Sequence, residues 1–115
     1  VQAQILNLFA DLQRDLGIAY LFISHDLGVV RHIAHDVLVM YLGLAVEQGP
    51  KERIFARALH PYTQGLMRAI PPLKRMPEGA RFSTIPGTVP DLAHLPAGCA
   101  FADRCPKVYL KDFSL

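Results

Sequence analysis

The sequence predicts an α/β fold, with helices packed around short strands, followed by a loop-rich and proline-rich tail. Three observations predict this fold class. Apolar residues recur at three- and four-residue steps over the first sixteen positions, and a short, almost wholly apolar run comes directly after them. Residues 71–106 then hold seven of the nine prolines, which disfavours regular structure there. At 115 residues, the chain is about the size of one small domain.

The first two elements are a helix and a buried strand. The helix is expected over residues 1–16, and its apolar face consists of Val1, Ile5, Leu8, Phe9, Leu12 and Leu16. Gly17 follows at a position where helices commonly end. Residues 18–23 read Ile-Ala-Tyr-Leu-Phe-Ile, and this length and composition are typical of a strand buried on both faces of a parallel sheet.

The next elements form a helix, a hairpin and two further helices. A helix is expected over residues 27–34, with Ser24 or Asp26 as its candidate N-cap. Strands are expected at 37–41 and 44–48. Because the tight connection between them contains Gly43, they are expected to pair as a hairpin at a sheet edge. Short helices follow at 51–58 and 62–70, and a boundary is expected at Pro71-Pro72.

Composition and charge exclude several classes of protein. Twelve basic residues against ten acidic ones give a net charge of +2, too balanced to predict nucleic acid as a partner. No apolar run approaches the ~20 residues needed to cross a bilayer, and no secretory leader is visible. The chain begins at Val1, already within a helical pattern, so we expect it to be part of a longer protein.

The trio Ser24-His25-Asp26 is the first candidate site. It comes at the end of the expected buried strand, where α/β proteins place ligand-contacting groups. An imidazole can donate one hydrogen bond and accept another, so His25 is suited to contact a phosphate oxygen. The alternative is that Ser24 or Asp26 caps the next helix and His25 only fills a turn.

The remaining histidines and both cysteines are weaker candidates. His32 and His35 share the spacing of some zinc ligands, but no third ligand is obvious. His60 precedes Pro61 and is interpreted as a turn residue. Cys99 and Cys105 are candidate iron–sulfur ligands, since Cys-Pro recurs beside such clusters, although a four-iron cluster needs about four thiolates. Two free thiols or a small disulfide loop are the alternatives.

Common catalytic motifs are missing from the sequence. It contains no Gly-Lys-Ser or Gly-Lys-Thr, and therefore no phosphate-binding P-loop. It also lacks Gly-x-Ser-x-Gly, His-Glu-x-x-His and Gly-x-Gly-x-x-Gly. No complete catalytic constellation of a common type is present.

A family resemblance rests on several segments that occur in order along the chain. They are Val1-Gln2-Ala3-Gln4-Ile5-Leu6-Asn7-Leu8, Leu21-Phe22-Ile23-Ser24-His25-Asp26-Leu27, Tyr41-Leu42-Gly43 with Val46-Glu47-Gln48-Gly49, His60-Pro61-Tyr62-Thr63, Gly87-Thr88-Val89-Pro90, and Gly98-Cys99-Ala100-Phe101-Ala102-Asp103-Arg104-Cys105-Pro106. Over residues 1 to about 107 the chain resembles the ATP-binding subunit of bacterial oligopeptide/dipeptide ABC transporters, a family that includes nickel importers.

The resemblance implies an organisation and a role for one histidine. Residues 1–58 would be the C-terminal part of a P-loop ABC nucleotide-binding domain, and residues 59–115 the C-terminal extension, divergent after about 107. His25 would be the switch-loop histidine, which contacts the γ-phosphate of ATP and helps to place the attacking water. In the family the P-loop, the signature motif and the Walker B carboxylate all precede the position of Val1. The isolated chain is therefore expected not to hydrolyse ATP, although the full-length family does so with Mg²⁺.

The resemblance also implies partners, a location and a departure from the family. The partners would be a second ATP-binding subunit, membrane permease subunits and, indirectly, a solute-binding protein, at the cytoplasmic face of the inner membrane. Family members with an iron–sulfur cluster have a third cysteine after the Arg-Cys-Pro segment, and this sequence has none there. The alternative functions are a non-enzymatic metal-binding or interaction module, and a truncated product without function.

Overall fold

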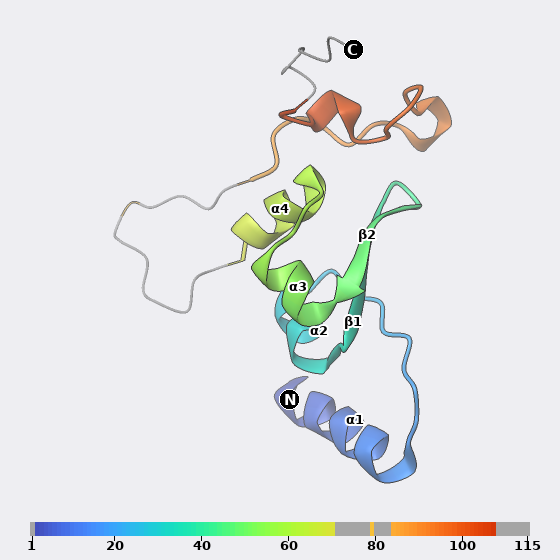
Figure 1. The fold of residues 1–115 in the computed structure, drawn as a ribbon, viewed down its shortest axis with the longest axis vertical. Coiled ribbons are helices and arrows are strands. Elements are labelled where there is room, and N and C mark those ends of the chain that lie inside the picture. The colour runs from blue at the N-terminus through green and yellow to red at the C-terminus, as the bar shows by residue number, and fades with distance from the viewer. Residues whose placement is uncertain (1, 71–78, 80–83, 108–115) are drawn as a thin grey trace.

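The computed structural model describes residues 2–70, 79 and 84–107. In chain order the elements are α1 (Gln2–Leu16), α2 (Leu27–Ile33), β1 (Asp36–Tyr41), β2 (Leu44–Pro50), α3 (Lys51–Ala56), α4 (Pro61–Arg68) and the 3-10 turns η1 (Leu92–His94) and η2 (Ala102–Arg104). Figure 1 shows α1 at one end of the molecule, the hairpin with α2 to α4 in the middle, and residues 84–107 at the other end. The predicted mixture of helices and strands is confirmed. The expected boundary at Pro71-Pro72 and the divergent residues 108–115 lie outside the described residues.

The two strands form an antiparallel hairpin, as predicted. Tyr41 pairs with Leu44, so two residues make the turn. Both have positive φ, 50° at Leu42 and 77° at Gly43, which is the conformation of the two-residue turns that match strand twist. The register shifts between Val39 and Met40, because Val39 pairs with Glu47 whereas Met40 pairs with Ala45. Val46 is therefore the extra residue of a bulge, and Val46 and Glu47 are both partly buried although they are consecutive.

One face of the hairpin carries the core. Along β1, Val37, Val39 and Tyr41 are buried while the residues between them are exposed, the alternation of a strand covered on one side. Val37 and Val39 pack with Ile54 of α3, which is completely buried. Side chains from α2 and α4 complete this cluster: Val30, Tyr62, Leu66 and Met67. The short helices are thus held by burial against the hairpin.

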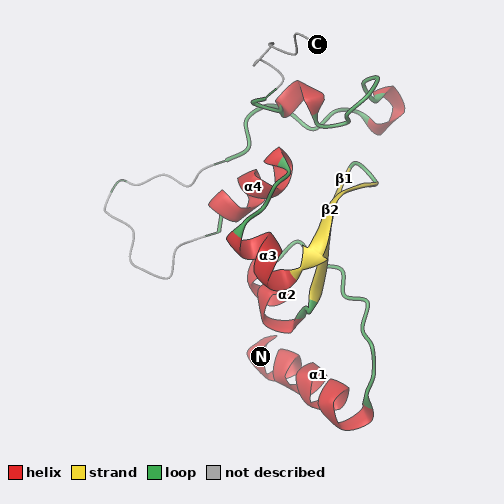
Figure 2. Ribbon diagram, in the orientation of Figure 1, coloured by secondary structure: helices red, strands yellow, loops and turns green. Residues whose placement is uncertain are grey.

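Residues 18–23 differ from the prediction, because they form no strand. They belong to a long loop between α1 and α2 (Figure 2). Leu21 and Ile23 are 93% and 89% exposed. A strand needs at least one neighbouring strand to form backbone hydrogen bonds with, and the sheet in the described part of the chain consists of β1 and β2 alone. The apolar run therefore has nothing to pair with here.

The apolar face predicted for the first helix is also largely uncovered. The helix itself is confirmed as α1, but Ile5, Leu8 and Leu16 are 46%, 54% and 66% exposed. Leu6, which the periodicity did not include, is the buried residue of this helix. Phe9 packs on Tyr20 of the following loop, with ring centroids 5.6 Å apart. The predicted face thus lacks an element large enough to cover it among the described residues.

Candidate functional site

The Ser24-His25-Asp26 turn is exposed, and the side chains of its two outer residues accept hydrogen bonds from backbone N–H groups. The Asp26 carboxylate accepts hydrogen bonds from the N–H groups of Gly28 and Val29 at 3.0 and 3.2 Å, which makes it the N-cap of α2. The Ser24 hydroxyl accepts a hydrogen bond from the Asp26 N–H at 3.0 Å. These bonds fix the turn and leave the exposed His25 between them. The capping predicted for Asp26 is confirmed, and the His25 ring is presented to solvent.

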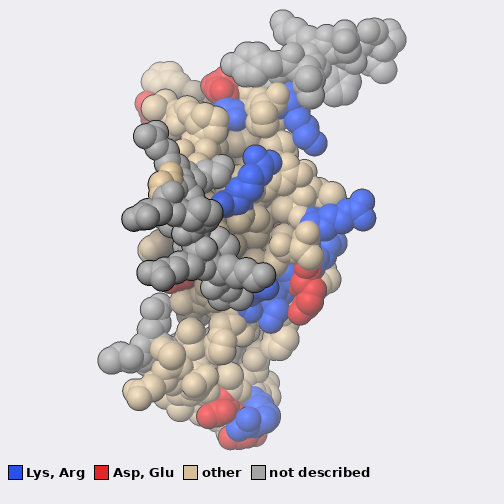
Figure 3. Space-filling model, turned by 90° about the vertical axis from the view of Figure 1, so that its left-hand side faces the viewer, with Lys and Arg blue, Asp and Glu red and all other residues tan. Residues whose placement is uncertain are grey.

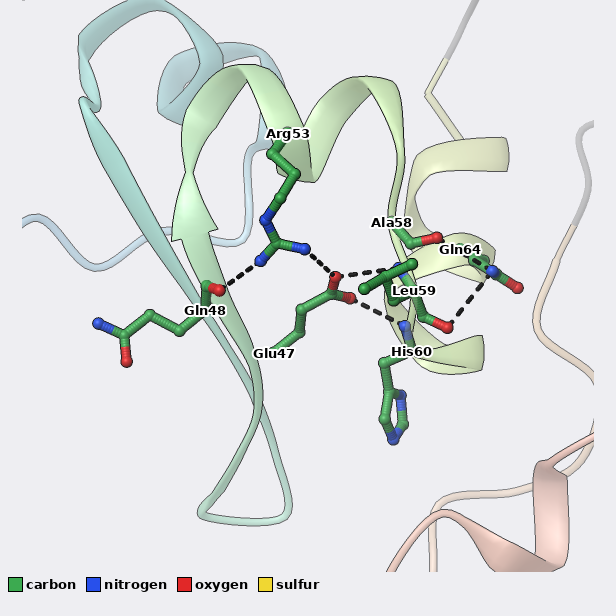
Figure 4. A network of polar contacts seen from close by, with 7 residues as sticks. All are labelled: Glu47, Gln48, Arg53, Ala58, Leu59, His60 and Gln64. Atoms are coloured by element: carbon green, nitrogen blue, oxygen red, sulfur yellow. Dashed lines mark hydrogen bonds and ion pairs between the residues drawn. The ribbon is translucent and has the colours of Figure 1, made fainter.

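A second site lies at the centre of the molecule, around the carboxylate of Glu47. The backbone N–H groups of Leu59 and His60 donate to its two oxygens at 2.9 and 3.0 Å. The Arg53 guanidinium donates to it at 3.2 Å and also binds the carbonyl of Gln48. Figure 4 shows the carboxylate between the guanidinium on one side and the chain before α4 on the other. Only 6% of the Glu47 side chain is exposed, so this is a buried, fully hydrogen-bonded anion.

The hydrogen bonds determine the charge state of Glu47. Burial raises the pKa of its carboxyl, but the hydrogen bonds from His60, Leu59 and Arg53, together with the nearby Thr63 hydroxyl, outweigh burial and hold the pKa below the ordinary value of 4.5. Thr63 is completely buried. Its hydroxyl lies close enough to contribute to this lowering, although it makes no hydrogen bond of normal geometry with the described residues. Glu47 is therefore ionised near neutral pH.

His60 is the N-cap of α4. Its ring Nδ1 accepts a hydrogen bond from the Tyr62 N–H at 3.1 Å, and Pro61 occupies the first helical turn, where its missing N–H is not needed. Burial lowers the pKa of the imidazole, and the negative charge of Glu47 opposes this only in part. The ring is therefore neutral near pH 7, as its role as a hydrogen-bond acceptor requires. The prediction of a turn residue at His60 is confirmed, and the cap defines what it does.

An aromatic socket, defined as Tyr41, His60 and Tyr62, encloses the ring of Phe101. The Phe101 centroid lies 5.1 Å from that of Tyr41 in an edge-on arrangement, 5.5 Å from Tyr62 and 5.7 Å from His60. The rings of Tyr41 and Tyr62 also pack on each other, with their centroids 4.7 Å apart. Phe101 is only 2% exposed. Residues 84–107, called the tail below, are thus fastened to the hairpin tip and α4 by one buried ring.

Arg104 secures the tail beside the socket. Its guanidinium donates to the carbonyls of Pro86 and Ile85 at 3.1 and 3.3 Å, and makes a longer contact of 3.4 Å with the Tyr41 hydroxyl. Ile85 in turn packs on α4 so closely that a Cβ on Gly65 would lie 2.6 Å from its Cγ1. The two ends of the tail therefore meet at the same face of the hairpin and α4.

The two cysteines flank η2 in the tail and are free thiols. Cys99 is exposed, whereas Cys105 is half-buried against the cluster of Tyr41, Ala100 and Phe101. Among residues 2–70, 79 and 84–107, no three His, Cys, Asp or Glu side chains lie together as metal ligands would. Two thiols without further ligands do not fit a four-thiolate cluster.

The structure keeps the predicted site residues apart and adds others. His25 precedes α2, while Cys99 and Cys105 belong to the tail. The sequence reasoning missed Glu47 as a buried anion and Phe101 and Arg104 as the groups that fasten the tail. One signal was available for Glu47, since a carboxylate in a short apolar strand needs hydrogen-bond donors if that face is covered.

On the face drawn in Figure 3, the described residues form no continuous patch of like-charged side chains. Blue basic side chains lie in separate groups on a largely uncharged surface, and red and blue atoms meet at the α1 end, where Arg14 pairs with Asp11 and Asp15. Of the helices that the structure describes, none is long and apolar enough to cross a bilayer.

Comparison with known proteins gives a family match and a set of relatives. Residues 46–109 match the model of the family described as the oligopeptide/dipeptide transporter, C-terminal region. The matched range contains Glu47, His60, Phe101 and Arg104, while Tyr41 of the socket precedes it.

The relatives are named as ATP-binding proteins of peptide transport. The chain is 51% identical over 106 residues to the di/tripeptide transport ATP-binding protein DppF of Pseudomonas aeruginosa, covering 92% of this chain and 32% of that protein. It is 51% identical over 109 residues to a putative peptide import ATP-binding protein of Brucella ovis, covering 91% and 32%. For a probable peptide ABC transporter ATP-binding protein of Sinorhizobium fredii, the identity is 52% over 109 residues, covering 92% and 30%. The chain thus spans about a third of the length of the curated relatives it matches.

Proposed function

Since the chain belongs to the family of the oligopeptide/dipeptide transporter C-terminal region, we propose that it forms the C-terminal part of the ATP-binding subunit of a peptide-importing ABC transporter. The match over residues 46–109 carries this proposal. The relatives support it, because their names join ATP binding with peptide import. ATP is the substrate in this function, and its hydrolysis would drive uptake by the complete transporter.

The proposed organisation places residues 1–58 in the nucleotide-binding domain of an ABC ATPase and residues 59–115 in its C-terminal extension. Exposed apolar surface in the first part supports the assignment. Leu21 and Ile23 are almost fully exposed, and Leu38 and Met40 on the outer face of β1 are 51% and 54% exposed. A larger P-loop domain would supply the neighbouring strands and helices that such residues require.

His25 is the proposed catalytic residue of this chain. The bonds made by Ser24 and Asp26 fix the turn, so the imidazole is presented on a defined backbone rather than a loose loop. An imidazole N–H can donate to an oxygen of the γ-phosphate, where negative charge develops during transfer, and can help to orient the attacking water.

The remaining catalytic groups would lie outside this chain. The sequence has no Gly-Lys-Ser or Gly-Lys-Thr to cradle the phosphates, and the described residues gather no three ligands for Mg²⁺. We therefore assign the phosphate and magnesium sites to the rest of the subunit. The 115-residue chain alone is expected to lack ATPase activity.

The proposed partners follow from this function. They are a second ATP-binding subunit, the permease subunits that cross the membrane and, through them, a solute-binding protein. The proposed location is the cytoplasmic face of the inner membrane. Peptides are the proposed cargo, in keeping with the relatives' names.

Peptide uptake in the source organism tests this function. The complete gene that contains this sequence is deleted, and uptake of a labelled tripeptide is measured after complementation with the wild type, His25→Ala or His35→Ala. His35 is the matched control, because it is exposed and lies between α2 and β1. Uptake restored by the wild type and His35→Ala, but not by His25→Ala, is expected. Unchanged uptake in the deletion strain, with no other importer expressed, would exclude the proposed function.

A further inference from the structure

One residue of the aromatic socket, His60, can become positively charged by protonation. His60 lines it together with Tyr41 and Tyr62, and the Phe101 ring of the tail is packed against all three. In the neutral state His60 makes two contacts at once, since its Nδ1 caps α4 through the Tyr62 N–H and its ring packs on Phe101. The cap and the docking of the tail therefore share one imidazole.

Protonation of this imidazole is incompatible with the cap. A proton on Nδ1 turns the acceptor into a donor, so the hydrogen bond from the Tyr62 N–H is lost. The Tyr62 N–H, in the first turn of α4, is then left without its capping partner. The new positive charge would also have to remain on a half-buried ring that packs against the buried Phe101. Both effects favour rotation of the ring out of the socket.

The charged groups around His60 do not offer the imidazolium a free partner. Glu47 on β2 is the nearest anion, but its oxygens already accept from the N–H groups of Leu59 and His60 and from Arg53 of α3. On the tail side Arg104 contacts the hydroxyl of Tyr41, another residue of the socket, and is itself positive. The lowered pKa of His60 agrees with this, because burial outweighs the attraction of Glu47.

From this geometry we propose that His60 is a pH-sensitive latch, whose protonation opens the aromatic socket and releases Phe101 and the tail from the hairpin. At neutral pH the ring is uncharged and the tail is docked. As the pH falls below the ordinary imidazole value of 6.5, the released state gains population, because the charged ring is better solvated there than against Phe101. Glu47 stays ionised over this range, since its own pKa lies below 4.5.

The two thiols of the tail provide a built-in measurement. Cys105 is packed on the socket cluster, while Cys99 is exposed nearby in the same tail. The ratio of their alkylation rates by N-ethylmaleimide, followed by mass spectrometry on the complete subunit, therefore reports docking and cancels the common effect of pH on thiols. In the wild type the Cys105:Cys99 ratio is expected to rise about threefold or more between about pH 7.5 and about pH 5.5.

A non-titrating cap is the matched variant. Asparagine is a favoured N-cap that can accept from the Tyr62 N–H at any pH in this range, so His60→Asn is expected to keep the ratio constant. His94→Asn is the control, because His94 is exposed on η1 and bonds only to Asp91 among the described residues, and it should respond as the wild type does. An equal rise in His60→Asn, or a flat ratio in the wild type, would overturn the proposal.

A measurement on the wild type alone keeps the proposal testable if the variant folds poorly. Deuterium exchange at the imidazole carbon between the two nitrogens, resolved by mass spectrometry, gives the titration midpoint of His60 itself. The midpoint of the alkylation ratio is expected to coincide with it. A separation of more than about one pH unit would assign the release to another group and contradict the latch.

Discussion

Glu47 holds the chain segment that begins α4, because its Oε2 accepts a hydrogen bond from the backbone N–H of His60, thirteen residues further on, at 3.0 Å. The same carboxylate accepts from the Leu59 N–H. His60 then caps α4 and forms one wall of the socket around Phe101. A single buried anion on β2 therefore fixes the position of the helix and, through it, the docking place of the tail.

Replacing the carboxylate with an amide tests this role. The N–H groups of Leu59 and His60 donate to different oxygens of Glu47, and in Glu47→Gln one of these oxygens becomes an NH2 donor, so one backbone N–H is left facing another donor. Leaving such a group unsatisfied costs about 1–3 kcal/mol. We expect a loss of this size in the free energy of unfolding of the complete subunit, measured by urea denaturation.

The control for that change is Glu52→Gln, an exposed glutamate in the first turn of α3. An exposed substitution of this kind should shift the unfolding free energy by less than about 0.5 kcal/mol. Equal effects of the two substitutions would show that the Glu47 bonds add nothing to stability.

The lowered pKa of Glu47 predicts a pH dependence at the acid end. A carboxyl whose pKa is depressed by folding stabilises the protein above its unfolded value, here 4.5, and this contribution is lost as the pH falls through the lower folded value. The difference in unfolding free energy between the wild type and Glu47→Gln should therefore shrink below about pH 4.5. Unfolding curves of both proteins at several pH values measure it. A difference that stays constant down to the lowest pH would contradict the assignment.

Removing the ring of Phe101 should release the tail. Phe→Ala substitutions in cores cost about 3–5 kcal/mol, and here the loss falls on the contact between the tail and the socket. Phe101→Ala is therefore expected to raise the alkylation rate of Cys105 toward that of Cys99 at neutral pH. Leu92→Ala, at a side chain that is 67% exposed, should leave both rates unchanged. A Cys105 rate unaffected by Phe101→Ala would mean that the ring does not hold the tail.

Local patterns in the sequence were sufficient to predict those elements whose stabilising contacts lie within a few residues along the chain. The turn at Leu42-Gly43 predicts the hairpin because it needs residues with positive φ, and Asp26 predicts the start of α2 because a capping carboxylate acts within three residues. The prediction for 18–23 was wrong because a strand depends on neighbours, which a local apolar run does not reveal.

The central contacts could not be predicted in the same way. The burial of Glu47 depends on the bulge at Val46 and on a segment thirteen residues away. The socket brings residues of β1 and of the start of α4 around a ring of the tail, and the bond between Arg104 and Tyr41 spans 63 positions. Such pairings follow from packing of the whole chain, and no local periodicity encodes them.

The proposed role of His25 is tested most directly by separating ATP binding from ATP hydrolysis in the complete subunit with its partners. Single-turnover hydrolysis and equilibrium nucleotide binding are measured for the wild type, His25→Ala and His35→Ala. Loss of a group that stabilises the transferring phosphoryl should lower hydrolysis by about 100-fold or more while ATP affinity changes by less than about threefold. His35→Ala should match the wild type in both measurements. Hydrolysis by His25→Ala at the wild-type rate would contradict the catalytic role assigned to this histidine.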